Sequence, residues 1–122
     1  MTGIIIDTCG WVAIVDARIN IDLSLESQIG PVEIKITNSI LNELKILENQ
    51  NGSGLLLELL EERAEIINSE RDYTHTDDEI LELAISQSLP VLTVDKTLKS
   101  RLHAANAAVI EVTSSKGLRL IE

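Results

Sequence analysis

Short apolar runs alternate with longer amphipathic stretches along most of the chain. Runs rich in Ile and Val predict β-strands, and a helical spacing of apolar residues between them predicts α-helices. The expected strands are 3–6, 32–36, 64–67, 90–94 and 108–112. The expected helices are 9–18, 38–49, 52–63, 76–88 and 96–105, with a further short helix over 20–29. This alternation indicates a three-layer α/β domain, with a central parallel sheet of about five strands flanked by helices.

Two further segments complete this picture. The tail "KGLRLIE", after a turn at Gly117, is compatible with one last strand, and "NQNGSG" at 49–54 predicts a loop between two helices. Neither segment has the length or composition of a linker between domains. We therefore expect a single domain over residues 1–122, a length sufficient to bury a full core.

Acidic residues follow two of the predicted strands at the point where each apolar run stops. Asp7 comes directly after "GIII", and Asp95 comes directly after "PVLTV". In open α/β sheets, ligands bind beyond the carboxyl ends of the parallel strands, which share one edge. We therefore expect Asp7 and Asp95 to lie on the same edge of the sheet.

A third acid is predicted to reach this edge from a helix. In "NSILNELKIL" the apolar stripe consists of Ile40, Leu44 and Leu47. Glu43 lies three residues after Ile40 and four before Leu47, so it shares the face of the helix that turns to the core. A carboxylate on such a face is costly unless it is paired or bound to a metal.

A fourth acid begins the next helix. In "HTDDEILELA", Asp77 precedes Ile80 by three residues and Ala84 by seven, which places it in the first turn of the buried stripe. Asp78 is rotated by about 100° around the helix axis and is expected to be more exposed. We rank Asp77 above Asp78, although both are able to contribute to one site.

Helix capping offers a simpler role for three of these acids. "TDDE" matches a capping box at Thr76, Asp95 precedes a predicted helix, and Asp7 or Thr8 precedes another. Each Asp taken alone is explained at least as well by capping as by a metal site. Glu43 lies in the middle of its helix, where no capping role exists.

Charge and composition narrow the possible functions. Ten Lys and Arg against twenty Asp and Glu give a net charge of −10, which disfavours broad electrostatic binding of nucleic acids. Converging carboxylates can nevertheless bind a hard cation. Cys9 is the sole cysteine, which fits a cytoplasmic location, and no apolar run approaches the length of about 20 residues that spans a membrane.

The order of these motifs resembles the PIN-domain family of metal-dependent ribonucleases over nearly the whole chain. "IIIDTCGW" resembles the opening strand of that family with its Asp-Thr-Asn signature, with Cys9 where Asn is commoner. "ITNSILNELKIL" resembles the helix that carries the second acid, and "HTDDEILELAISQSLPVLTVDKTLKSRL" resembles the third and fourth motifs. The double Asp and the closing "GLRLIE" are closer to the stand-alone archaeal and ribosome-biogenesis branch than to VapC-type toxins.

The resemblance implies a PIN fold and endonucleolytic cleavage of single-stranded RNA with Mg²⁺ or Mn²⁺, by in-line phosphodiester hydrolysis. It also makes a homodimer plausible. It implies Asp7 as the central metal ligand, with Asp77 and Asp95 beside it, and Glu43 either binding metal or orienting water. Thr8 and Thr93 are predicted to hydrogen-bond the carboxylates or a phosphate. The cluster that begins the following helix could contact the RNA backbone or form a solvated helix face: Lys96, Lys99 and Arg101.

Three other functions remain open from the sequence. A PIN-like scaffold in ribosome biogenesis would bind RNA or protein with little or no catalysis, and the −10 charge favours it because a partner would then deliver the substrate. A toxin of a toxin–antitoxin pair would bind an antitoxin protein. A receiver-like domain ranks last, because it would need an acceptor Asp after the third strand, and "AEIINSE" ends without one.

Overall fold

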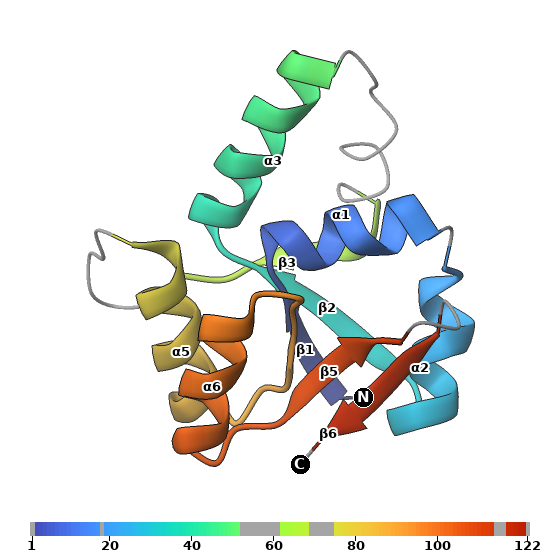
Figure 1. Ribbon diagram of the computed structural model, residues 1–122, viewed down its shortest axis with the longest axis vertical. Helices are drawn as coiled ribbons and strands as arrows, with labels where there is room; N and C mark the ends of the chain where they lie inside the picture. The colour runs from blue at the N-terminus through green and yellow to red at the C-terminus, as the bar shows by residue number, and fades with distance from the viewer. Residues whose placement is uncertain (1, 18, 52–61, 69–74, 114–116, 122) are drawn as a thin grey trace.

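The computed structural model describes residues 2–17, 19–51, 62–68, 75–113 and 117–121 (Figure 1). Strands and helices alternate along them, as the hydrophobic pattern predicts. The strands are β1 (Thr2–Ile6), β2 (Val32–Ile36), β3 (Ala64–Ile66), β4 (Val91–Leu92), β5 (Val109–Val112) and β6 (Leu118–Ile121). The helices are α1 (Thr8–Ala17), α2 (Ile21–Ile29), α3 (Asn38–Asn51), α5 (Thr76–Ser86) and α6 (Lys96–Ala104).

All six strands form one sheet in the order β3-β2-β1-β4-β5-β6. The first five strands are parallel, and β6 pairs with β5 in the antiparallel direction. The expected strand in the tail is thus confirmed, and its direction follows from the short connection. Thr113 N donates to Gly117 O at 2.8 Å, and the chain between these two residues is far shorter than any crossover between parallel strands.

Helices cover both faces of this sheet, which makes the three layers visible in Figure 1. Helices α1 and α2 lie on one side, with α3 next to α1, whereas α5 and α6 lie side by side on the other. Strand β1 is therefore buried from both faces, and Ile4, Ile5 and Ile6 are all fully buried. A continuous apolar run, rather than an alternating one, is what such a central strand requires.

The structure differs from one sequence prediction, and another lies largely outside the described residues. Asn49 to Asn51 belong to α3, so the helix continues into the segment expected to be a loop, and the predicted helix 52–63 lies largely outside the described residues. None of the described helices combines the length and apolar character that crossing a bilayer requires.

The position of β1 next to β4 determines where a ligand can bind. The chain leaves β1 toward β2 on one side and later crosses back to β4 on the other, so the connections diverge at this pair of strands. Such a divergence opens a crevice beyond the carboxyl ends of the strands. Residues that directly follow β1 and β4 are therefore the ones best placed to build a site.

Candidate active site

A cavity of ≈ 580 Å³ lies beyond the carboxyl ends of β1 and β4. Four acids that the sequence singled out line it, and each comes from a different place in the fold. Asp7 follows β1, Glu43 projects from α3, Asp77 lies in the first turn of α5, and Asp95 follows β4. The other lining residues are Thr8, Cys9, Val12, Ala13, Asp16, Leu47, Thr76 and Val94.

Asp7 is the most constrained of these acids. The residue is 5% exposed, and its carboxylate accepts hydrogen bonds from Thr93 Oγ1 at 2.6 Å and from the Gly10 amide at 2.8 Å. The Cys9 thiol donates to the same carboxylate, with Sγ at 3.3 Å from Oδ1 and 3.2 Å from Oδ2. The hydrogen bond from the Gly10 amide makes Asp7 the N-cap of α1. The same residue therefore caps a helix and holds a rigidly fixed carboxylate.

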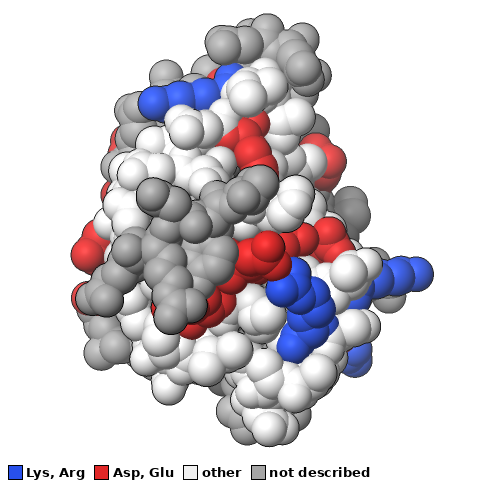
Figure 2. All heavy atoms as spheres, turned by 90° about the vertical axis from the view of Figure 1, so that its left-hand side faces the viewer, with Lys and Arg blue, Asp and Glu red and all other residues white. Residues whose placement is uncertain are grey.

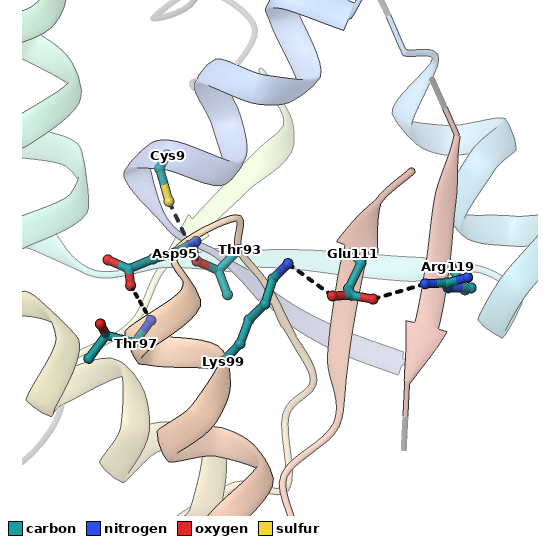
Figure 3. A network of polar contacts seen from close by, with 7 residues as sticks. All are labelled: Cys9, Thr93, Asp95, Thr97, Lys99, Glu111 and Arg119. Carbon is teal, nitrogen blue, oxygen red and sulfur yellow. Dashed lines mark hydrogen bonds and ion pairs between the residues drawn. The ribbon is translucent and has the colours of Figure 1, made fainter. Parts of the chain in front are cut away.

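Asp95 also caps a helix while lining the cavity. Its Oδ1 accepts from the amides of Thr97 at 2.8 Å and Leu98 at 3.1 Å, at the start of α6. The Asp95 amide donates to Thr93 Oγ1 at 3.1 Å, so the hydroxyl of Thr93 connects the two acids that follow β1 and β4. In Figure 3 the second carboxylate oxygen of Asp95 points away from the capped amides.

Glu43 is held from α1. Thr8 Oγ1 donates to Glu43 Oε2 at 3.1 Å, across the contact between α1 and α3. Ile40 and Leu44 are fully buried, and Glu43 is half-buried beside them on the side that lines the cavity. The helical phase therefore places this carboxylate at the margin of the buried stripe, where it is accessible to a ligand.

Asp77 has no capping role in the structure. Helix α5 begins at Thr76, and its N-cap residue is His75, which makes no side-chain hydrogen bond to the helix. The capping box expected at Thr76 is therefore not formed. Asp78 lies outside the residues that line the cavity, and its carboxylate pairs with Arg101 Nη2 at 2.7 Å.

Burial and mutual repulsion act on the carboxylates of the cavity. Burial raises the pKa of Asp7, the hydrogen bonds from Thr93, Gly10 and Cys9 oppose this increase, and the charge of Asp77 adds to it. The pKa of Asp77 is raised as well, first by burial and then by the charge of Asp95. The cavity therefore concentrates negative charge at a cost in stability, which a bound cation would offset.

This cost gives a prediction about pH. A group whose pKa is raised by folding stabilises the protein fully only below its unfolded pKa, which for an aspartate is near 3.8, and loses this contribution as the pH rises through the folded pKa. Asp77→Asn should therefore raise the thermal midpoint at pH 7 in EDTA by only about a degree, because solvent screens this half-buried carboxylate, and the gain should vanish at pH 3.5. Calorimetry at both pH values tests this, and a midpoint for Asp77→Asn at or below wild type at pH 7 would contradict it.

The chemistry of these ligands fits a hard divalent cation. Carboxylate oxygens are what Mg²⁺ and Mn²⁺ bind, and Mg²⁺ commonly uses one or two carboxylates together with several waters. Within the described residues, no three His, Cys, Asp or Glu side chains lie close enough together to hold one ion. The acids instead surround the cavity, and Asp7, Glu43 and Asp95 are each held by their own donors, so waters or small side-chain rotations would have to complete the coordination.

Comparison with known proteins identifies the fold family. The family described as a PIN-like domain matches residues 4–114. The chain belongs to the PIN-like domain family. Its fold is similar to the solved structure of the PIN domain endonuclease Utp24, with a TM-score of 0.82 and 22% identity over 97% of this chain and 90% of that chain. A search of curated proteins gives no significant match.

Basic residues lie beside the acidic cavity of this PIN-like domain. Two of the three residues predicted to contact the RNA backbone form ion pairs within the protein. Figure 2 shows acidic side chains across the middle of one face, with basic side chains directly next to them. Arg101 pairs with Asp78 at 2.7 Å. Lys99 pairs with Glu111 at 2.9 Å, as Figure 3 shows. Lys96 is exposed at the start of α6. A contact between RNA and Lys99 or Arg101 would thus have to compete with an existing partner.

The sequence patterns did not single out one part of the cavity in this PIN-like domain. Val12, Ala13 and Asp16 line it from α1, and Leu47 lines it from α3. The signal was present in the spacing, because Val12, Ala13 and Asp16 lie three, four and seven residues after Cys9 and so share its helical face. These residues extend the cavity away from the acids, along the contact between α1 and α3.

Proposed function

We propose that this PIN-like domain is a metal-dependent endoribonuclease that cleaves single-stranded RNA by in-line phosphodiester hydrolysis. The observation that carries the proposal is that four carboxylates from four separate elements line one cavity at the divergence between β1 and β4. Three are not explained by capping alone, because Glu43 and Asp77 cap no helix and Asp95 Oδ1 alone accepts the capping bonds. A purely structural role predicts no such gathering of like charges.

Each side chain has a distinct task in this proposal. Asp7, fixed by three donors, provides a rigid central ligand, while Asp77 and Asp95 face it from α5 and from the end of β4. Glu43, held by Thr8, orients a water or adds a ligand. Bound Mg²⁺ or Mn²⁺ would supply the Lewis-acid activation of water and the neutralisation of phosphate charge that phosphodiester hydrolysis needs.

The protein attracts a phosphate group only when the phosphate is already close to this cavity. Helices α1, α5 and α6 all begin at residues that line the cavity or lie next to them, so the positive ends of three helix dipoles meet there. At longer range the net charge of −10 repels RNA. We therefore expect cleavage to be strongly dependent on divalent cations, because cations both complete the site and screen this repulsion.

The decisive experiment is incubation of the purified protein with a randomised pool of single-stranded RNA and 1–5 mM Mn²⁺ or Mg²⁺, followed by sequencing of the product ends. We expect endonucleolytic products that require the cation and disappear in EDTA. Glu26→Gln, which removes one exposed carboxylate on α2, serves as the matched control and should cleave like wild type. Absence of cleavage with either cation across the whole pool would refute the proposal.

A PIN-like scaffold with little catalysis is the second candidate. It is favoured by the separation of the acids, since no three potential ligands among the described residues lie close enough to hold one ion. A scaffold predicts a stable RNA or protein complex that survives combined replacement of Asp7 and Asp95 by Asn. A partner-free protein that cleaves RNA with multiple turnovers would exclude it.

Cys9 provides a further prediction about the proposed site. Its thiol is a weak donor to Asp7 and also lies 3.5 Å from Thr93 Oγ1. Cys9→Ala removes this donor and should lower the single-turnover cleavage rate and Mn²⁺ affinity by about fivefold, the value of one modest hydrogen bond. Cys9→Ser retains a donor and should stay within about twofold of wild type. Equal behaviour of the two variants would show that the thiol only fills space.

A further inference from the structure

The part of the cavity between α1 and α3 differs chemically from the part that carries the four acids. Its walls are the half-buried apolar side chains Val12, Ala13 and Leu47, and Asp16 lies beyond them on α1. Along a helix with a rise of about 1.5 Å per residue, Asp16 is about 12 Å from Thr8, which marks the acidic end. The cavity therefore continues past the acids for roughly the length of one nucleotide.

A phosphate is not a suitable occupant for this extension. Among the described residues that line the cavity there is no Lys or Arg, and the one charged side chain at the far end is the carboxylate of Asp16. A ligand group that enters must be flat or apolar enough to pack against Val12 and Leu47, and it must offer hydrogen-bond donors to Asp16. A nucleobase meets both conditions, since single-stranded RNA presents its bases by packing their faces and reading their edges.

We propose that Val12, Ala13, Leu47 and Asp16 form a nucleobase subsite that selects guanine next to the cleaved phosphate. This inference deepens the proposed endoribonuclease function and rests on it. Guanine carries two neighbouring donors on its Watson–Crick edge, the ring N1–H and the exocyclic amino group, and a carboxylate accepts such a pair with both oxygens. Adenine and cytosine place a ring acceptor beside their amino group, which a carboxylate repels, and uracil offers a single N–H between two carbonyls.

The solvent exposure of the Asp16 side chain determines how strong the preference for guanine is expected to be. A carboxylate in contact with solvent gains less from a new hydrogen bond than a buried one, because water already satisfies it. The preference for guanine is therefore expected at about tenfold, the lower end of the range for bidentate recognition of a base. The half-buried apolar walls add affinity for any base without distinguishing among the four.

Two measurements test the subsite. The first is the binding of an oligouridine decamer with one central guanosine, compared with the same RNA carrying inosine, which lacks only the amino group. Fluorescence anisotropy with Asp7→Asn protein and Mg²⁺ allows binding without cleavage. We expect inosine to bind about tenfold more weakly than guanosine, and Asp16→Ala, introduced in the same Asp7→Asn background, to bind both RNAs alike. Glu26→Ala is the matched control, because it removes a carboxylate outside the cavity.

The second measurement identifies, by sequencing, the base next to each product end after cleavage of the randomised RNA pool. Wild-type cleavage should be enriched at guanosine, and Asp16→Ala should lose the enrichment because its cleavage rate at guanosine falls about tenfold, to the rate at the other bases, which should not change. Cleavage without a guanosine preference would refute the subsite and leave the proposed nuclease intact. A guanosine-over-inosine preference in binding that depends on Asp16, in a protein that cleaves nothing, would support the subsite and refute the nuclease. An inosine penalty that persists in Asp16→Ala would assign the preference to other residues.

Discussion

Asp7→Asn is expected to reduce cation-dependent RNA cleavage by about a thousandfold or more while the fold persists. The change removes the charge at the centre of the acidic cavity but almost no volume. The amide oxygen can still accept from Gly10 N, so the cap of α1 is retained, and the amide nitrogen can donate to Thr93 Oγ1, which is able to accept. The loss would therefore be chemical rather than structural.

The measurement is a single-turnover cleavage rate with saturating Mn²⁺, together with a thermal melt in EDTA. The melt should show a midpoint equal to or above that of wild type. Burial raises the pKa of the Asp7 carboxyl, so its negative charge costs stability at neutral pH, and the Asn variant carries no such charge. Glu26→Gln again provides the control for loss of one negative charge. A rate within tenfold of wild type for Asp7→Asn would remove Asp7 from its proposed central role.

Gly10→Ala is expected to destabilise the protein by about 2–3 kcal/mol and to reduce cleavage by at least a hundredfold. A Cβ atom at this position would lie 2.6 Å from the carbonyl oxygen of Leu92 and 2.9 Å from Asp7 Oδ1. The first contact is with the backbone of β4, which cannot move without its sheet partners. The second would push the carboxylate of Asp7 away from its donors, so stability and catalysis should fall together.

Gly117→Ala is the matched control for this change. A Cβ at Gly117 would meet Thr113 Oγ1 at 3.4 Å, which is ordinary contact, and Gly117 is not among the residues with a positive φ. Chemical denaturation and single-turnover kinetics on both variants would separate the outcomes. If Gly10→Ala were as stable and active as Gly117→Ala, α1 would have room to shift away from β4, and the close approach would have no role in holding Asp7.

The strands, and the acids that follow them, were predictable because both depend on simple patterns. An uninterrupted apolar run such as Ile4–Ile6 indicates a strand buried from both faces, and the parallel arrangement then brings Asp7 and Asp95 to one edge. The position of Glu43 followed from helical phase relative to Ile40 and Leu44. These inferences use only periodicity and the geometry of α/β sheets.

The contacts that complete the cavity depend on details that no pattern encodes. The thiol of Cys9 reaches Asp7 because the turn into α1 folds it back, whereas the sequence alone showed only that Cys9 stands where Asn is commoner. Helix α5 starts without the predicted capping box, because its N-cap residue is His75 rather than Thr76. Lys99 is paired with Glu111, which lies on β5 and becomes its neighbour only once α6 packs on that strand.

The antiparallel direction of β6 has a practical consequence for experiments. Because β6 runs back along β5, Ile121 lies beside Val109, at the end of the sheet where the parallel strands begin. Thr2 starts β1 at that same end of the sheet, with β4 and β5 between β1 and β6. The cavity opens at the opposite end of the strands. A fluorophore, an affinity tag or a surface attached through either end of this PIN-like domain would therefore leave the path of an RNA strand to the cavity clear.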